Sequence, residues 1–550
     1  MKRRLRAWPR LGLAVPLAAA VLLGASGPAA AGTADALPGS RGPAAGPIMP
    51  VTSCASLAHM NFTGVPDAPG KVISSAVVSD TLPAGPVSFC DVKGVFAPQT
   101  HFEFKLPVAA WHGQYVQEGC EALCGSLKQL SDSPDAGSNC TAADNGELAL
   151  ATDDEGHTGG LFDGLWAKNS LALRVVFGLT SEHSLAQMAK AVITAYYGRP
   201  ASFRYYDGCS TGGREALMLA QRYPGDFNGI IAGAPAGNAA PLALLNAWLV
   251  AANTGPGGHQ ILTAGQIPAL HAAVIRACGN VHGVVTIPRH CGFNPASIQC
   301  PPGQDTASCL TPAQVHAVRE FYRGPADKKG RSLYNGGLPY GSELGWKGNF
   351  VKPAADTAAP ADTIDAAMAL NYLKYMAFWP NPPDSFTLAK VKFTDTEFRK
   401  LGLLGDAIYN ANNPHLRAFE ARGGKLILYH GWADQAIPPW SALDYYAAVE
   451  RASGGFRASQ AFSRLYMIPG AYHCLFAPDF SSANFADFLT PLISWVQRGI
   501  TPGTVEADTR SLTTGTITLR QKVRPYNALA PVTPAPGSLN GHYHYLGTYQ

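Results

Sequence analysis

The chain has 550 residues, of which 47% are hydrophobic and only 15% charged, with 58 Gly, 43 Pro and 11 Cys. This composition excludes a disordered protein or a coiled coil and indicates a globular protein with a large core. The formal net charge is +4, but five positive charges lie within the first ten residues, before any acidic residue. Without those five, acidic residues outnumber basic ones by one, so nucleic acid is not an expected partner.

The first 31 residues have the three parts of a secretory signal. Basic residues come first, an apolar run follows at 11–25, and small residues end the segment at 29–31. The run is shorter than the ~20 residues that a membrane span needs, and no later stretch reaches that length. We therefore expect residues 1–31 to be a signal peptide, the protein to be secreted, and no membrane to be bound.

Hydrophobic patterning predicts an α/β protein. Residues 32–50 are rich in Gly, Pro and Ala and predict a flexible lead-in. From about 75 to 235, β-rich runs such as 148–151 and 173–177 alternate with helical stretches such as 184–197, which favours a parallel sheet with crossover helices. Residues 240–415 lose this rhythm and hold four closely spaced cysteines, as an inserted domain would. An apolar strand returns at 425–429, and a helix is expected at 440–451.

The motif GCSTGG at 208–213 carries the strongest chemical signal. A probable strand at 202–207 precedes it and a probable helix at 214–223 follows it, which is the context of a nucleophile elbow. The glycines permit a sharp turn that raises the Ser210 hydroxyl above the sheet. The helix start then places the Thr211 N–H where an oxyanion would develop. We interpret Ser210 as a nucleophile and Thr211 as an oxyanion donor.

A serine hydroxyl needs a histidine base, and the histidine needs a carboxylate to orient it. In the chain order of α/β-hydrolases the acid comes next after the serine. Asp434 follows the strand at 425–429, whereas Asp444 lies within the following helix and Asp406 precedes the strand, so both are less well placed. His473 follows a further apolar strand at 465–468, and His430 is its rival. We predict a triad of Ser210, Asp434 and His473.

Cysteines flank two of these residues. Cys209 directly precedes the proposed nucleophile and Cys474 directly follows the proposed base. Disulfides persist in proteins that are exported, and a Ser–His contact would bring these neighbours within bridging distance. We expect a Cys209–Cys474 bridge. Because eleven is an odd number, one cysteine stays unpaired unless it bonds to another chain. The sequence has neither two CxxC pairs nor an HExxH motif, so a zinc site is not indicated.

Several motifs together resemble the tannase and feruloyl esterase family. They are GCSTGGR at 208–214, AQRYP at 220–224, GIIAGAP at 229–235, YHGWAD at 429–434 and HC at 473–474. Members of this family include secreted enzymes that cleave galloyl, feruloyl and mono-hydroxyethyl terephthalate esters. The resemblance implies an α/β-hydrolase fold in which 51–239 and 416–550 form the catalytic domain and 240–415 form a lid domain. It also implies the same triad and the same active-site disulfide.

Two stretches depart from the family pattern. Family lids usually carry an Asp-rich calcium loop, but residues 278–286 contain no acidic residue, so we expect no metal and no cofactor. The segment expected to supply the second oxyanion donor reads GCEALCG from Gly119 to Gly125, and its donor is left open.

Further disulfides are expected from proximity and from the family resemblance. They join Cys54 with Cys90, Cys278 with Cys291, and Cys300 with Cys309. Three cysteines then remain, enough for one bridge and one free thiol: Cys120, Cys124 and Cys140.

The sequence therefore predicts a secreted serine carboxylic ester hydrolase that acts on small aromatic esters of the phenolic acid, feruloyl or galloyl type through an acyl-enzyme. A serine peptidase requires the same triad and is one alternative. A secreted binding protein that has lost turnover is the other. The sequence leaves the identity of the ester and the oligomeric state open.

Overall fold

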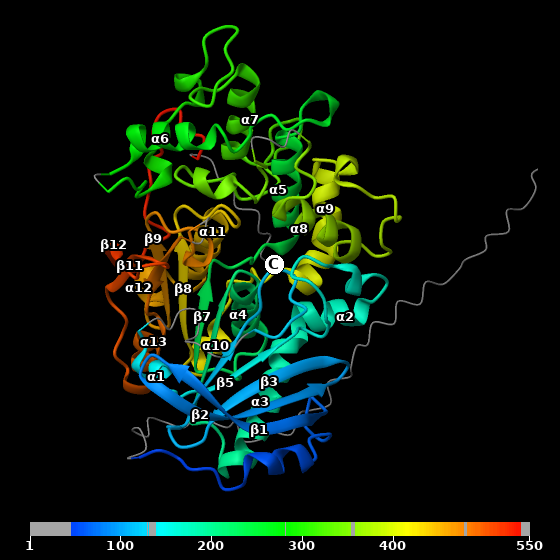
Figure 1. Cartoon of the computed structure of the whole chain (residues 1–550), viewed down its shortest axis with the longest axis vertical. Helices are drawn as coiled ribbons and strands as arrows, with labels where there is room; N and C mark the ends of the chain where they lie inside the picture. The colour runs from blue at the N-terminus through cyan, green and yellow to red at the C-terminus, as the bar shows by residue number, and fades with distance from the viewer. Residues whose placement is uncertain are drawn as a thin grey trace, which may run out of the picture. The chain divides into compact units, whose positions relative to one another are not determined.

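A nine-stranded sheet lies at the centre of the part of the chain that the computed structural model describes, namely residues 46–128, 130, 139–280, 282–353, 358–477 and 481–540 (Figure 1). Its strand order is β1-β2-β3-β5-β4-β6-β7-β8-β9. The strands are β1 (Gly70–Leu82), β2 (Gly85–Phe96), β3 (Thr100–Pro107), β4 (Gln114–Glu118), β5 (Ala149–Asp153), β6 (Phe203–Cys209), β7 (Gly229–Gly233), β8 (Lys425–Gly431) and β9 (Ser463–Ile468).

The sheet changes character along its width. Strands β1, β2, β3 and β5 pair antiparallel, whereas β5, β4, β6, β7, β8 and β9 pair parallel. Every residue of β7 and β9 is buried, because helices cover both faces of the parallel part. Strand β1 is mostly exposed along its length, as expected where one face of an antiparallel edge meets water.

Crossover helices connect the parallel strands. Helix α3 lies between β5 and β6, α4 between β6 and β7, and α11 between β8 and β9. The helices are α1 (Thr141–Asp144), α2 (Leu171–Val175), α3 (Ser181–Tyr197), α4 (Thr211–Arg222), α5 (Ala239–Ala252), α6 (Ile267–Cys278), α7 (Pro312–Arg323), α8 (Ile364–Asn371), α9 (Asp395–Leu404), α10 (Arg417–Ala421), α11 (Trp440–Ala452), α12 (Phe456–Ser459) and α13 (Leu489–Arg498).

A long insertion separates the neighbouring strands β7 and β8. Its described residues contain α5 to α9 and no strand of the central sheet, and they surround a hydrophobic cluster that includes Leu270, Phe321 and Trp346. In Figure 1 these helices gather at the end of the sheet toward which β7 and β8 point. The described residues between 46 and 540 form one compact unit. The division into a catalytic domain and a lid domain therefore stays a prediction.

A second, smaller sheet follows the last strand of the large one. It contains β10 (Ser482–Ala486), β11 (Val505–Ser511) and β12 (Ile517–Val523), all antiparallel, with α13 between β10 and β11.

The predicted strand at 173–177 is wrong, because these residues are helical. The Ser170 hydroxyl accepts the Leu173 N–H and begins α2, and a π-helical turn at Val176–Thr180 leads into α3. The guanidinium of Arg174 is buried and donates to backbone carbonyls, among them that of Ala167 at 3.0 Å. A short apolar run packs equally well as strand or helix, so periodicity alone could not separate them.

The other predicted elements agree with the structure within a few residues. They are the strands at 202–207, 425–429 and 465–468 and the helices at 184–197, 214–223 and 440–451.

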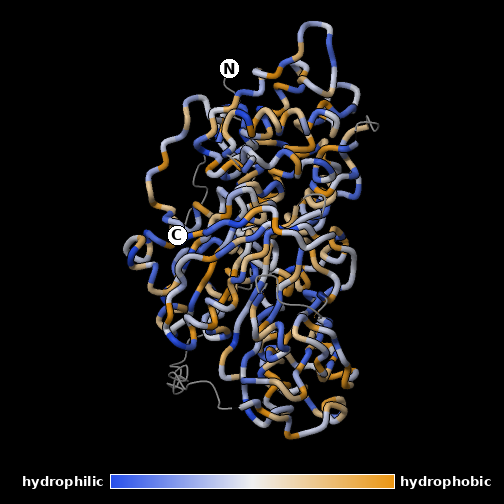
Figure 2. Tube along the Cα trace, turned by 60° about the vertical axis from the view of Figure 1, so that its left-hand side comes forward, coloured by the Kyte–Doolittle hydropathy of each residue, from blue (hydrophilic) through white to orange (hydrophobic). Residues whose placement is uncertain are grey.

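The N-terminal predictions fall mostly outside the described residues. This applies to the signal peptide at 1–31 and to most of the lead-in at 32–50. At the described end of the lead-in, the Ile48 N–H donates to the Trp111 carbonyl at 2.7 Å, and the flexibility of this segment stays a prediction. Hydrophobic and hydrophilic residues alternate over short stretches in Figure 2, and among the described helices we find none with the length and apolar character of a membrane span.

The described part of the chain contains five disulfides. Four are the bridges that the sequence predicted: Cys54–Cys90, Cys209–Cys474, Cys278–Cys291 and Cys300–Cys309. The fifth joins Cys120 with Cys124 and leaves Cys140 as a buried free thiol.

Candidate active site

Ser210 lies in a strained turn between β6 and α4. Its backbone has φ 62° and ψ −117°, a conformation that a residue with a side chain rarely adopts. The turn is possible because its neighbours are glycines: a Cβ on Gly208 would lie 2.7 Å from the Gly212 carbonyl carbon, and a Cβ on Gly213 would lie 2.2 Å from the Gly233 carbonyl oxygen. The geometry is that of a nucleophile elbow at the carboxyl end of a parallel strand.

Asp434 and His473 form a hydrogen-bonded pair on the loops after β8 and β9. The His473 Nδ1 lies 2.9 Å from the Asp434 Oδ2, while the other carboxylate oxygen accepts the N–H groups of Ala436 and Ile437 at 2.9 and 2.8 Å. Burial opposes the charge on Asp434, but the two histidines beside it outweigh burial and hold its pKa well below the usual range. Burial alone would lower the pKa of His473, yet the Asp434 charge raises it above 6.5.

The rival residues have other partners. His430 is fully buried, with its Nε2 2.8 Å from the Ile437 carbonyl and 3.2 Å from the Asp434 carboxylate. Asp444 accepts the side-chain amide of Asn335 at 2.6 Å, and Asp406 accepts that of Asn410 at 2.7 Å. Asp434 therefore has the partner that a triad acid needs, and His473, whose side chain is 19% exposed, is the more accessible histidine.

The Cys209–Cys474 bridge brings the serine and histidine segments together. The two cysteine Cα atoms are 5.8 Å apart although 265 residues separate them in the chain. Ser210 follows one of these cysteines and His473 precedes the other. The bridge therefore places the elbow beside the loop that carries the histidine.

The segment from Gly119 to Gly125 packs against the start of α4. The Thr211 hydroxyl donates to the Ala122 carbonyl at 2.6 Å, and the Gly212 N–H donates to the Cys120 carbonyl at 2.8 Å. Ala122 and Cys124 both have positive φ, so this loop is tightly turned. The segment that was predicted to supply the second oxyanion donor thus lies next to Thr211.

Two acidic side chains near His473 have no counterpart in the sequence prediction. The negative charges of Glu121 and Asp365 both raise the pKa of His473. Asp365 is 3% exposed and lies at the start of α8 in the insertion, and burial raises its own pKa to about 7. No motif marks this residue, and only the fold brings it near the histidine.

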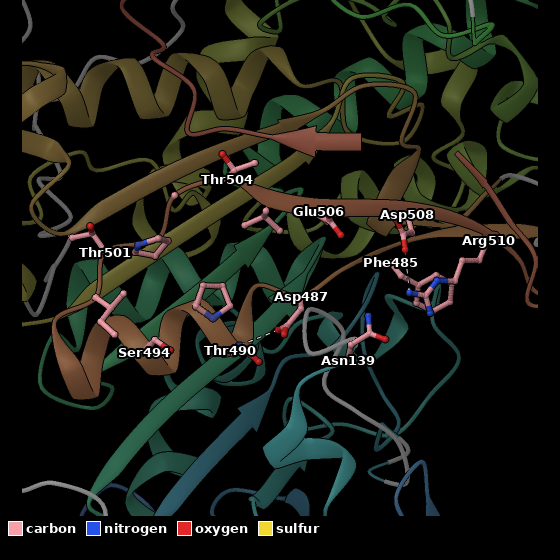
Figure 3. A pocket seen from close by; sticks show the side chains of 15 residues that line it. Asn139, Phe485, Asp487, Thr490, Ser494, Thr501, Thr504, Glu506, Asp508 and Arg510 are labelled. Atoms are coloured by element: carbon pink, nitrogen blue, oxygen red, sulfur yellow. Dashed lines mark hydrogen bonds and ion pairs between the residues drawn. The ribbon is translucent and has the colours of Figure 1, made fainter. Parts of the chain in front are cut away.

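A cavity of about 520 Å³ lies between α13 and β11, and its lining includes Asp487, Glu506, Asp508, Thr490 and Arg510 (Figure 3). The Thr490 N–H donates to the Asp487 carboxylate at 2.9 Å, and Arg510 pairs with Asp508 at 3.3 Å. Arg510 thus balances the charge of Asp508, and none of the residues that line this cavity belongs to the predicted triad.

The structure resembles solved esterases. Feruloyl esterase B from Aspergillus oryzae superposes with a TM-score of 0.71 at 23% identity, covering 86% of this chain and 96% of that one. The tannin acyl hydrolase from Aspergillus niger gives a TM-score of 0.67 at 19% identity, covering 90% and 96%. These similarities define a mixed α/β fold with a large central sheet, close to feruloyl esterase and tannase structures.

Sequence comparison then identifies the family. Residues 85–533 match the family described as "Tannase and feruloyl esterase". A mono(2-hydroxyethyl) terephthalate hydrolase from Piscinibacter sakaiensis is 29% identical over 527 residues, covering 84% of this chain and 86% of the relative. A probable feruloyl esterase from Arthroderma benhamiae is 31% identical over 357 residues, covering 62% and 63%. The chain belongs to the tannase and feruloyl esterase family, and it is a carboxylic ester hydrolase.

Proposed function

We propose that this protein is a secreted serine esterase that hydrolyses small aromatic esters with a triad of Ser210, His473 and Asp434. The main support for the proposal is the hydrogen bond between Asp434 and His473. The Cys209–Cys474 disulfide links the loop that contains His473 to the strained turn at Ser210. Five disulfides suit an oxidising, extracellular compartment and so support secretion.

In the proposed reaction the Ser210 hydroxyl attacks the ester carbonyl while His473 accepts its proton. Asp434 stays ionised, because two backbone N–H groups and two histidines surround it, and it stabilises the imidazolium that forms. The Thr211 N–H at the start of α4 faces the developing oxyanion, with a second donor from the Gly119–Gly125 segment. His473 returns the proton to the leaving alcohol, and water then cleaves the acyl-enzyme by the same path.

The aromatic substrate class rests on the relatives. Two of them are described as acting on feruloyl and hydroxyethyl terephthalate esters, which share an aromatic acyl group. We propose the same class here, with the insertion at 240–415 acting as a lid. Asp365, which the insertion contributes near His473, supports that role.

The proposed chemistry uses no cofactor and no catalytic metal. The loop that carries calcium in other lids has no carboxylate between Cys278 and Cys291, and the Asn280 side-chain oxygen is taken up by the N–H groups of His282 and Val284. An oxygen engaged in this way offers little to a cation, which wants six to eight oxygen ligands.

A substrate screen tests the proposal. We expect the purified protein to hydrolyse methyl ferulate or methyl gallate faster than an aliphatic methyl ester, and to leave a chromogenic peptide uncleaved. Peptide cleavage would favour the peptidase alternative. Loss of all turnover in a folded protein would favour the binding protein instead.

A further inference from the structure

A group of acidic side chains is buried beneath the elbow. Asp153 ends β5, Glu155 follows it, and Glu182 lies in the first turn of α3. Their exposed fractions are 1%, 1% and 5%. One carboxylate oxygen from each lies within 4.8 Å of those of the other two. We call these three residues the acidic cage.

The cage is only partly satisfied by hydrogen bonds. Asp153 accepts the Ser181 hydroxyl at 2.8 Å and the Glu155 N–H at 2.9 Å, and one oxygen of Glu182 accepts the Gln117 amide. Three carboxylate oxygens have no hydrogen-bond partner among the described residues. They are both oxygens of Glu155 and the second oxygen of Glu182. Buried polar atoms without a partner are costly, so these three oxygens indicate a ligand.

Charge is unbalanced around the cage. The guanidinium of Arg214 lines the same small space as Glu155 and Glu182, but it pairs with Glu215 at 3.4 Å and donates to two backbone carbonyls. When the three carboxylates of the cage are ionised, their negative charge exceeds the positive charge that Arg214 supplies.

A small cavity lies beside these groups. Its volume is about 10 Å³, which is room for a single water molecule or ion. Glu155, Glu182, Ser181, Arg214 and Glu215 line it together with apolar side chains. Glu155 and Glu182 thus border a space of atomic size. Asp153 does not line it, but it accepts the hydroxyl of Ser181, which does.

We propose that Asp153, Glu155 and Glu182 bind one hard cation of calcium size. Calcium takes carboxylate oxygens at about 2.3–2.6 Å in a flexible geometry, and one carboxylate oxygen from each cage residue lies within 4.8 Å of the other two, close enough for the three to share one ion. Magnesium gives up its water reluctantly, and a cavity this small leaves little room for a hydrated ion. The site differs from the lid loop at 278–291.

The cage connects to the elbow through Glu215. That carboxylate accepts the Tyr206 hydroxyl at 2.9 Å and the Cys120 N–H at 3.2 Å, and Glu215 lines the same small cavity as Glu155 and Glu182. A cation in the cage would therefore act on the position of the Gly119–Gly125 segment. Its role is structural, and its test is independent of the proposed esterase activity.

Elemental analysis and thermal melting of the full-length protein test the proposal. After desalting we expect about one equivalent of calcium per chain. In protein stripped by partial unfolding with a chelator, we expect calcium chloride to raise the melting temperature by several degrees and magnesium or sodium chloride to do less. The isosteric variant Glu155→Gln should lose both the bound calcium and the response. The control Asn280→Ala, in the lid loop, should keep both.

Three results would overturn it. No bound cation together with no melting response would mean that protons alone neutralise the cage. Binding of magnesium or sodium in preference to calcium would refute the calcium-sized site. Calcium that is lost in Asn280→Ala but kept in Glu155→Gln would place the metal in the lid loop. If Glu155→Gln does not fold, Glu182→Gln and the wild-type elemental analysis decide in its place.

Discussion

At the scale of single residues, the strained backbone of Ser210 and the hydrogen bond of His473 carry the proposed chemistry. We predict that Ser210→Ala lowers kcat/KM for an aromatic ester by about 10⁴-fold to 10⁶-fold, because the acyl-enzyme can no longer form. The variant should keep the wild-type circular dichroism spectrum. Ser79→Ala, on the exposed part of β1, is the matched control and should retain full activity. A tenth of wild-type activity in Ser210→Ala would place the nucleophile elsewhere.

The raised pKa of His473 sets a second expectation. The base must be neutral to accept a proton, so the rate falls as the pH drops through its pKa, and the Asp434 charge moves that pKa above 6.5. We expect the acidic limb of the kcat/KM profile to have its midpoint above pH 6.5. In Asp434→Asn the midpoint should move down and the rate should fall steeply. An acidic limb centred below pH 6.5 in the wild type would contradict the assignment.

At the scale of elements, Asp444 on α11 is buried against the insertion, where it binds Asn335. Burial raises its pKa to about 7 from 3.8, so the folded state holds this proton more tightly than the unfolded state does. Its contribution to stability is complete below about pH 4 and is lost as the pH rises through 7. The asparagine in Asp444→Asn cannot ionise, so this variant does not lose that stability as the pH rises.

We therefore predict that the difference in free energy of unfolding between Asp444→Asn and the wild type shifts in favour of the variant, by up to about 3 kcal/mol, when the pH is raised from 5 to 9. Urea unfolding at the two pH values measures the difference. Glu506→Gln, at an exposed position of β11, is the control and should show no such pH-dependent gain. An equal stability difference at both pH values would mean that Asp444 does not titrate in this range.

The elements were predictable to different degrees. The elbow strand and helix, β8 and β9 are marked by apolar runs that end at Gly or at polar loops, and the structure has them within a few residues of the expected bounds. The run at 173–177 became helical because Ser170 caps a helix and Arg174 found carbonyl partners far away in the chain. Contacts of that kind, like the approach of Asp365 to His473, depend on tertiary structure and leave no local signal.

At the scale of the whole molecule, the Cys209–Cys474 bridge joins segments 265 residues apart. In the chain-entropy model such a long loop gives on the order of 5 kcal/mol as a ceiling. We predict that replacing both cysteines by serine lowers the melting temperature and also lowers kcat, because Ser210 and His473 lose their tether. The Cys300–Cys309 pair, which closes a loop of only 9 residues, is the control.

Replacing the control pair by serine should cost less stability and leave kcat unchanged. Equal losses of kcat in the two double variants would show that the bridge beside the elbow has no special effect on the active site. Measurement of kcat at a temperature well below both melting transitions separates this effect from unfolding.

The insertion between β7 and β8 also fixes the order in which a growing chain acquires its parts. The ribosome releases Ser210 and its strand first, then the whole insertion, and only afterwards Asp434 and His473. Until the last of these emerges, Ser210 lacks its proposed base and Cys209 lacks its disulfide partner. We therefore expect a nascent or prematurely ended chain to be hydrolytically silent, so that the cell that makes the enzyme is spared its activity until synthesis is nearly finished.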